Sequence, residues 1–306
     1  MCRPPCARSQ ALPGSDPRRS VLKSIATLPN LLTLANAACG LLAISKAIDA
    51  LSAAGEGAAF YELMKFSCFL IFLAMVFDGL DGMVARLTKT TSDFGAQLDS
   101  FADAVTFGVA PAILTKALIQ HEGPLLGYNL SPRLSFAACA CFALLAILRL
   151  ARFNLESGTE KKKGKFFRGL PSPAAAGSAT SLIWIYLVMH KPNPGADEGV
   201  AGLVDGISTL DFSAVLTWMP PLLLLWLPLL GLLMVSRIQY PHGFAWISSE
   251  RNNFFNLVAV VFIAGALYLA PVPLLFVVFN FTVLSGVARS VLRRTPAPEL
   301  ESEGKA

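Results

Sequence analysis

The chain contains 306 residues, of which 54% are hydrophobic and only 15% are charged, and its formal net charge is +5. Soluble globular proteins carry about 25% charged residues. This composition excludes a secreted disulfide scaffold, a disordered regulator and an ordinary soluble enzyme, and it predicts an all-α, polytopic membrane bundle.

Residues 1–24 are polar and basic and lack an apolar stretch, so we expect a cytoplasmic tail rather than a cleaved signal peptide. Residues 25–292 are predicted to form a single integral membrane domain, and residues 293–306 a disordered cytoplasmic tail. A span needs about 20 mostly apolar residues. The sequence predicts eight such helices, at roughly 28–48, 62–86, 97–119, 134–153, 172–190, 214–235, 253–270 and 273–291.

The distribution of lysine and arginine predicts the orientation of these helices. With the N-terminus inside, twenty of the 25 basic residues fall on the same side, in the N-terminal tail, in the loops 86–95, 149–168 and 236–251, or at the C-terminal end from Arg289 onward. The loop 191–213 on the opposite side carries four acidic residues instead. Basic loops remain in the cytoplasm, so both termini are expected there, in a protein of the cell inner (plasma) membrane.

Four aspartates lie at or near the ends of the second and third predicted spans. Asp78 and Asp81 are three residues apart, and Asp99 and Asp103 are four apart, so each pair projects from one helix face. The polar segment between the pairs is short, which predicts a helical hairpin that brings both faces together near the cytoplasmic surface. Acidic residues within membrane helices are costly and usually functional.

Facing carboxylates would repel one another without a counter-charge, and Arg86 supplies only one positive charge. An all-oxygen site suits Mg²⁺ or Mn²⁺, and two such cations are the usual clamp for in-line displacement at phosphorus. Gly82 and Gly95 would let a diphosphate approach the backbone, with Arg86 as a planar donor. The alternative is a structural acid–base cluster or four solvated acids.

Residues 78–103 follow the pattern D-x2-D-G-x2-A-R-x8-G-x3-D-x3-D at every defined position and resemble the CDP-alcohol phosphotransferase family. The resemblance implies that Asp78, Asp81 and Asp99 bind two metal ions and that Asp103 is both a ligand and the catalytic base. It also implies residues that bind the donor substrate, which is expected to be CDP-diacylglycerol. The residues that the resemblance implies for donor binding are Asn30, Thr33, Gly82, Arg86 and Ser92. Gly95 is added to this set because it opens the second acidic helix, where the diphosphate would approach the backbone.

Three further polar stretches, 149–154, 167–173 and 234–241, lie at predicted cytoplasmic span ends. A zwitterionic acceptor needs a cation for its carboxylate and an oxygen for its ammonium. Arg149, Arg152 and Arg237 are candidates for the first role and Asn154 for the second, although each arginine could equally be a snorkelling anchor. These stretches resemble those of membrane phosphatidylserine synthases, which implies phosphatidyl transfer to L-serine with release of phosphatidylserine and CMP.

Other interpretations stay open at this point. Another acceptor, such as glycerol 3-phosphate, an inositol phosphate or choline, would fit the same family, and a cation-coupled transporter would also place acids in a membrane. A homodimer is implied by the resemblance alone. His121, His190 and His242 stand apart in the sequence near span ends and are interpreted as interfacial residues rather than metal ligands.

Overall fold

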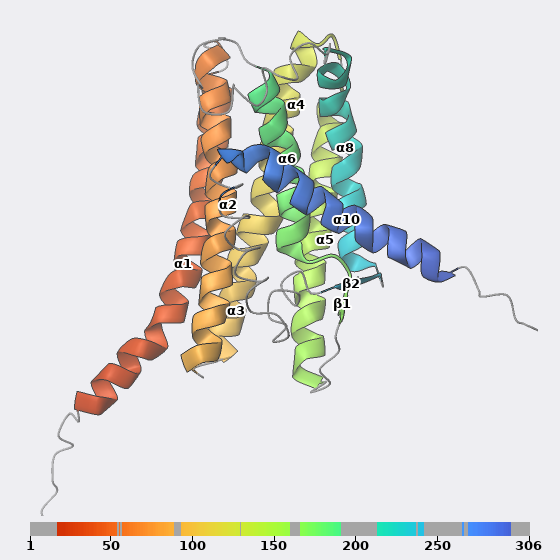
Figure 1. Cartoon of the computed structure of the whole chain (residues 1–306). Coiled ribbons are helices and arrows are strands. Elements are labelled where there is room, and N and C mark those ends of the chain that lie inside the picture. The colour runs from red at the N-terminus through yellow and green to blue at the C-terminus, as the bar shows by residue number, and fades with distance from the viewer. Residues whose placement is uncertain are drawn as a thin grey trace, which may run out of the picture.

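The computed structural model describes residues 17–53, 55, 57–88, 93–128, 130–159, 166–190, 213–236, 238–241, 265 and 269–294 (Figure 1). The helices within these residues are α1 (Pro17–Ser52), α2 (Gly57–Thr88), α3 (Asp93–Asp103), the π-helix η1 (Ala104–Val109), α4 (Ala110–Leu125), α5 (Pro132–Thr159), α6 (Ser172–Met189), α8 (Ser213–Val235) and α10 (Pro271–Arg294).

Seven helical spans in the described part of the chain are long and apolar enough to cross a membrane, which confirms the prediction of a helical membrane bundle. They correspond to seven of the eight predicted spans. The remaining predicted span, 253–270, lies almost entirely outside the described residues. The chain is therefore an integral membrane protein built from stacked apolar helices, which satisfy their own backbone hydrogen bonds in lipid.

The first two spans pack against each other along much of their length (Figure 1). Ala43, Ala47 and Ala50 of α1 recur at helical spacing, are fully buried, and belong to the same core cluster as Phe60 and Met64 of α2. Small residues at such an interface let two helices approach closely, which is the main source of helix association in a bilayer.

The third span is not a single regular α-helix. It runs through α3, η1 and α4 from Phe94 to Leu125, and it is one of the two most buried of the seven spans. The π-helical segment begins directly after Asp103 and includes the buried residues Thr106, Phe107 and Gly108. Short π-helical segments occur mostly as insertions in α-helices and are frequent at functional sites.

A short antiparallel ribbon departs from the all-helical expectation. Strand β1 (Phe166–Arg168) pairs with β2 (Gln239–Pro241), and Phe167 lies opposite Tyr240. The chain then turns at Gly169, whose φ of +84° and contact with the Met234 carbonyl group leave no room for a side chain. The Gly169 backbone N–H donates to the Ile238 carbonyl oxygen, which joins the second and third predicted polar stretches, and the Leu170 N–H donates to the Leu233 carbonyl oxygen in the last turn of α8.

The last helix, α10, crosses the bundle obliquely instead of lying parallel to the other spans (Figure 1). It packs on α6 at Gly177, where a Cβ atom would overlap the Phe279 ring. Asn280 also donates a hydrogen bond to Ser181 at 3.2 Å and accepts one from Ser178 at 2.8 Å. These polar contacts fix α10 to one of the most buried helices.

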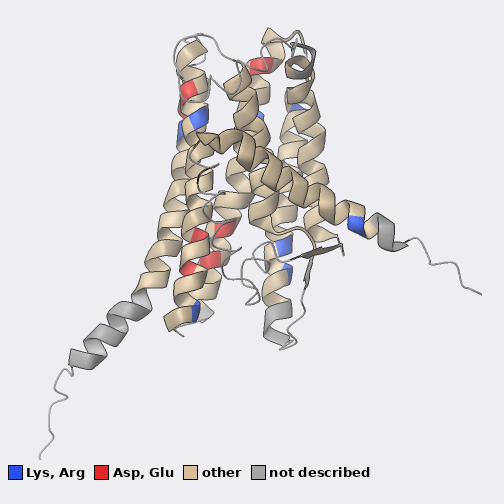
Figure 2. Ribbon diagram, viewed as in Figure 1, with Lys and Arg blue, Asp and Glu red and all other residues tan. Residues whose placement is uncertain are grey.

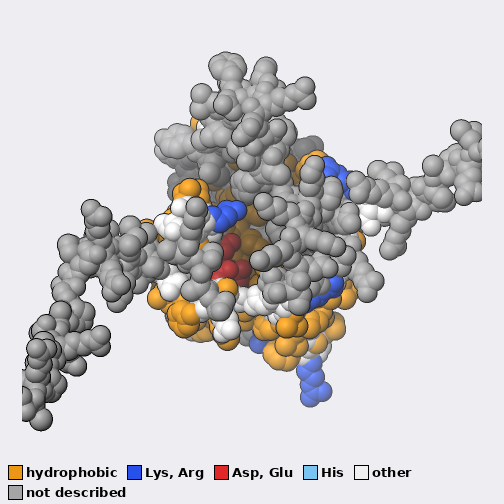
Figure 3. Space-filling view, turned by 90° about the horizontal axis from the view of Figure 1, so that it is seen from below, with side chains coloured by type: hydrophobic (Ala, Val, Ile, Leu, Met, Phe, Trp, Pro, Cys, Tyr) orange, Lys and Arg blue, Asp and Glu red, His pale blue; other side chains and the backbone are white. Residues whose placement is uncertain are grey.

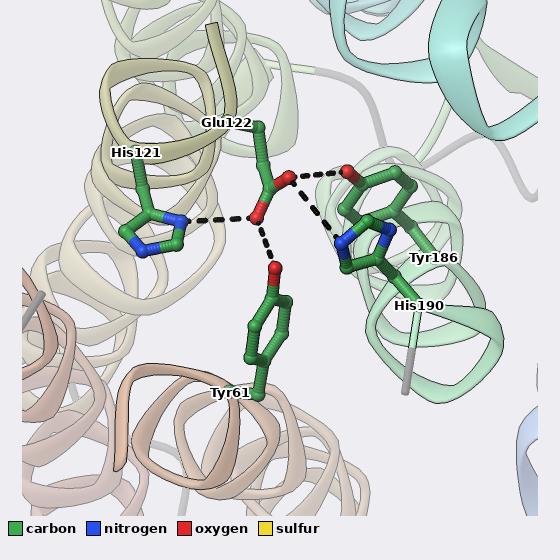
Figure 4. Close-up of polar contacts among 5 residues, drawn as sticks. All are labelled: Tyr61, His121, Glu122, Tyr186 and His190. Atoms are coloured by element: carbon green, nitrogen blue, oxygen red, sulfur yellow. Dashed lines mark hydrogen bonds and ion pairs between the residues drawn. The ribbon is translucent and has the colours of Figure 1, made fainter. Parts of the chain in front are cut away.

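A buried polar cluster, formed by Tyr61, His121, Glu122, Tyr186 and His190, joins α2, α4 and α6 (Figure 4). The tyrosine hydroxyls each donate to Glu122 at 2.7 Å, one to each carboxylate oxygen. The His121 Nδ1 atom lies 3.0 Å and the His190 Nε2 atom 4.0 Å from that carboxylate. Two histidines expected at the interface thus meet around a fully buried glutamate, while His242 lies outside the described residues.

Candidate active site

Acidic residues of α2 and α3 lie close together in the lower half of the bundle as drawn in Figure 2. Seen from below, acidic side chains lie in a hollow with hydrophobic side chains at its floor, and basic side chains lie beside it (Figure 3). Acidic and basic side chains therefore lie close together at this hollow, next to hydrophobic side chains of the bundle.

Three of the four predicted aspartates form a compact group. Asp78 of α2 and Asp99 and Asp103 of α3 each offer one carboxylate oxygen, and these oxygens all lie within 4.8 Å of one another. The two acids of α3 are one helical turn apart, so both face α2. The Asp99 Oδ1 atom is buried and has no hydrogen-bond partner among the described residues.

Asp81 lies outside that compact group and is held by α1. The Thr33 hydroxyl donates a hydrogen bond to Asp81 Oδ2 at 2.7 Å, and both side chains are buried. The first span therefore contacts the acidic residues directly, through a residue that the sequence singled out for donor binding. Asn30, one turn earlier on α1, is half-buried.

A second residue of α1, Asn36, also contacts the acidic side chains, and sequence reasoning missed it. The Asn36 Nδ2 atom donates to Asp103 Oδ1 at 3.3 Å, and Asn36 is fully buried. The signal that could have found it is its position three residues after Thr33, on the same face of an apolar helix.

The predicted acceptor residues of α5 lie next to the acidic helix and next to α6. Asn154 and Ser100 exchange hydrogen bonds, with the Asn154 Nδ2 atom 2.9 Å from the Ser100 hydroxyl. The Arg149 guanidinium donates to the Ser172 hydroxyl and interacts electrostatically with Asp103. Arg152, one turn after Arg149, is half-buried. Two of the three polar stretches, around 149–154 and 167–173, therefore meet beside the aspartates.

The remaining predicted contacts are distributed around the end of α2. Arg86 is exposed, and its Nε atom donates to the Gly82 carbonyl oxygen at 2.9 Å. A Cβ atom at Gly82 would meet no described atom within 4 Å, so the space beside that backbone is open. Gly95 is half-buried near the start of α3. Ser92 and Arg237 lie outside the described residues.

Comparison with protein families identifies the class of the chain. Residues 26–226, which contain most of α1, the helices α2 to α6, all four aspartates and more than half of α8, match the sequence profile described as CDP-alcohol phosphatidyltransferase. The chain belongs to this family. It is therefore a transferase of phospholipid synthesis, anchored in a membrane by its helices.

Individual relatives extend the match over most of the chain. It is similar to a CDP-diacylglycerol–serine O-phosphatidyltransferase of Helicobacter pylori, with 30% identity over 85% of this chain and 90% of the relative. An enzyme of the same description from Methanocaldococcus jannaschii is 35% identical over 72% of this chain and 76% of its own length. An archaetidylserine synthase of Methanothermobacter thermautotrophicus is 38% identical over 53% of this chain and 59% of its own length.

The aspartate group fits the divalent cations that the family implies. Its donors are carboxylate oxygens, the ligands preferred by Mg²⁺ and Mn²⁺. Three of these oxygens lie within 4.8 Å of one another. Because like charges repel at that separation in an apolar interior, a bound cation would stabilise the group. The unpartnered Asp99 Oδ1 atom provides a free ligand position within the group.

Proposed function

We propose that the protein transfers the phosphatidyl group of CDP-diacylglycerol to L-serine and releases phosphatidylserine and CMP. The observation that carries this proposal is the group of Asp78, Asp99 and Asp103, next to which α5 supplies Arg149 and Asn154. The names of the relatives support serine as the acceptor.

Asp78, Asp81, Asp99 and Asp103 are the residues proposed to hold two Mg²⁺ or Mn²⁺ ions. When bound, such ions neutralise the carboxylates and stabilise the charge that develops on the diphosphate. The Thr33 hydroxyl fixes one oxygen of Asp81, at 2.7 Å, so that the carboxylate keeps its orientation towards the site.

Asp103 is the proposed catalytic base. It accepts the proton of the acceptor hydroxyl as the hydroxyl oxygen attacks the phosphorus that carries the diacylglycerol. The bond between this phosphorus and the bridging oxygen breaks, and CMP leaves with the electron pair. Neither cysteine nor histidine is found in residues 78–103, so we infer direct transfer without a covalent enzyme intermediate.

The donor is proposed to lie along α1, the end of α2 and the start of α3. The open space beside Gly82 would admit the diphosphate, and the exposed Arg86 is near enough in sequence to bind one phosphate. The full set of proposed donor contacts is Asn30, Thr33, Gly82, Arg86, Ser92 and Gly95.

The acceptor carboxylate is proposed to bind the arginines of the polar stretches. Arg149 is the best placed of these, because it reaches α6 at Ser172 and also interacts with Asp103. Arg152 and Arg237 complete the proposed set, with Asn154 as an oxygen ligand for the ammonium group. The asymmetry of basic loops supports a site at the cytoplasmic face of the inner membrane. A homodimer is proposed from the family resemblance.

The test is CMP release from CDP-diacylglycerol by the purified protein, measured with a panel of acceptors and with Mg²⁺, Mn²⁺ or a chelator. We expect release that requires both a divalent cation and L-serine, with phosphatidylserine formed in equal amount. Preference for glycerol 3-phosphate, an inositol phosphate or choline would show that the protein is a transferase of the same family with an acceptor other than serine. Ion flux across proteoliposomes without CMP release would support the transporter alternative.

A further inference from the structure

The side chain of Asn36 carries an unused hydrogen-bond acceptor next to Asp103. Its Nδ2 atom donates to Asp103 Oδ1 at 3.3 Å. An ionised carboxylate can only accept hydrogen bonds, so the amide must present its nitrogen to Asp103. The Asn36 Oδ1 atom is then left buried, with no hydrogen-bond partner among the described residues.

The backbone at Asn36 is held firmly against the third span. The hydroxyl of Thr106, a fully buried residue of η1, donates to the Asn36 carbonyl oxygen at 3.2 Å. One turn later on α1, a Cβ atom at Gly40 would overlap the Thr106 side chain. Helix α1 therefore packs closely against η1 here, with Asn36 beside the junction of α3 and η1.

The position of the free oxygen suits a substrate with two polar groups. The ends of a planar amide are about 2.2 Å apart, so Asn36 Oδ1 lies within about 5.5 Å of Asp103 Oδ1. A buried carbonyl oxygen without a partner is destabilising, so a donor from the substrate would be favoured there. A substrate hydroxyl at Asp103 with an ammonium on the neighbouring carbon would satisfy both oxygens.

We propose that Asn36 positions Asp103 through its amide nitrogen and, through its Oδ1, selects an acceptor alcohol that carries an ammonium on the neighbouring carbon. This inference rests on the proposed function, since it takes Asp103 as the base and L-serine as one such amino alcohol. It adds a residue on α1 to the acceptor residues proposed on α5.

The test compares kcat/KM for L-serine with that for 3-hydroxypropanoate, which is serine without its amino group, using the full-length purified protein. We expect wild type to prefer serine by about ten- to a hundredfold, the range of one charge-assisted hydrogen bond. Asn36→Leu, of similar size but without polar atoms, should bring this ratio close to one and lower kcat for both acceptors. An unchanged ratio in Asn36→Leu would overturn the inference, as would equal use of both acceptors by wild type.

A second variant separates the two roles and guards against misfolding of the first. Asn36→Asp retains an oxygen but replaces the donor to Asp103 with a repelling group, so it should keep the preference for serine while kcat falls. A wild-type kcat in Asn36→Asp would refute the positioning role. Asn280→Leu makes the same chemical change on α10, where Asn280 contacts Ser178 and Ser181, and should leave the ratio unchanged.

Adding ethanolamine and ethanol to the acceptors distinguishes failure of this inference from failure of the proposed function. If wild type uses ethanolamine but not serine, and Asn36→Leu loses the preference for ethanolamine over ethanol, the proposed function falls and the inference stands. If wild type uses only alcohols without an amino group, both are refuted.

Discussion

The hydroxyl of Thr33 donates a hydrogen bond of 2.7 Å to Asp81 Oδ2, although the two residues are 48 positions apart in the chain. Both are buried, so the contact joins α1 to the acidic part of α2 in an apolar setting. The first span is thus part of the candidate active site rather than only a membrane anchor.

Replacing Thr33 with valine keeps the shape of the side chain and removes the donor. A hydrogen bond to a charged group contributes about 1.5–3 kcal/mol, so we expect kcat/KM to fall by about ten- to a hundredfold. Steady-state CMP release checks this. Thr282→Val is the matched control, because within the described residues the Thr282 hydroxyl donates to the Val278 carbonyl oxygen of its own helix. Equal activity of both variants would contradict a role for Thr33 in the site.

Asp78→Asn removes one charge from the group of three carboxylates while preserving its size. Loss of a direct metal ligand should reduce turnover by more than tenfold and weaken Mn²⁺ binding, because both charge and geometry are altered. Calorimetric titration with Mn²⁺ gives a readout independent of activity. Asp49→Asn, at a half-exposed ion pair with Lys46, serves as the control. Wild-type Mn²⁺ affinity in Asp78→Asn would exclude this residue as a ligand.

Arg149→Lys tests the acceptor side of the site. A lysine keeps the positive charge but cannot reproduce a planar guanidinium that donates to Ser172 and still has further N–H groups for a substrate carboxylate. We expect KM for serine to rise about tenfold or more, while KM for CDP-diacylglycerol changes little. Arg133→Lys, at the opposite end of α5, should change neither constant. A rise in KM for CDP-diacylglycerol alone would show that Arg149 does not bind the acceptor.

Glu122→Leu tests the polar cluster at the other end of the bundle. The change leaves the hydroxyls of Tyr61 and Tyr186 buried without their acceptor, at about 1–3 kcal/mol each. We expect a lower melting temperature in detergent. Glu62→Gln removes an ion pair with Lys65 from a mostly exposed glutamate and should have little effect. A melting temperature equal to that of wild type would show that the cluster does not stabilise the bundle.

The sequence allowed the spans and the acidic helices to be predicted, because their signals are local. Apolar stretches of span length located seven helices of the described structure, and the spacing of Asp99 and Asp103 placed both on one helix face. The position of Asp81 was less predictable. Its partner Thr33 is on another helix, and helical periodicity does not specify how two helices are rotated relative to each other.

Contacts between distant segments account for what sequence analysis missed. The π-helical turn after Asp103 has no periodicity of its own, yet it brings Thr106 to Asn36. Strands β1 and β2 have only three residues each and pair across two intervening spans. His121 directly precedes Glu122 on α4, whereas His190, at the end of α6, reaches the same carboxylate only because α4 packs against α6.

The most direct test of the catalytic assignment is single-turnover transfer by Asp103→Asn with saturating CDP-diacylglycerol, serine and Mn²⁺. If Asp103 is the base, the rate of CMP formation should fall by about 10²–10⁴-fold, the usual contribution of a positioned base. Donor affinity, measured separately by binding, should change much less, because Asp78, Asp81 and Asp99 remain. A wild-type rate of CMP formation in Asp103→Asn would contradict the account.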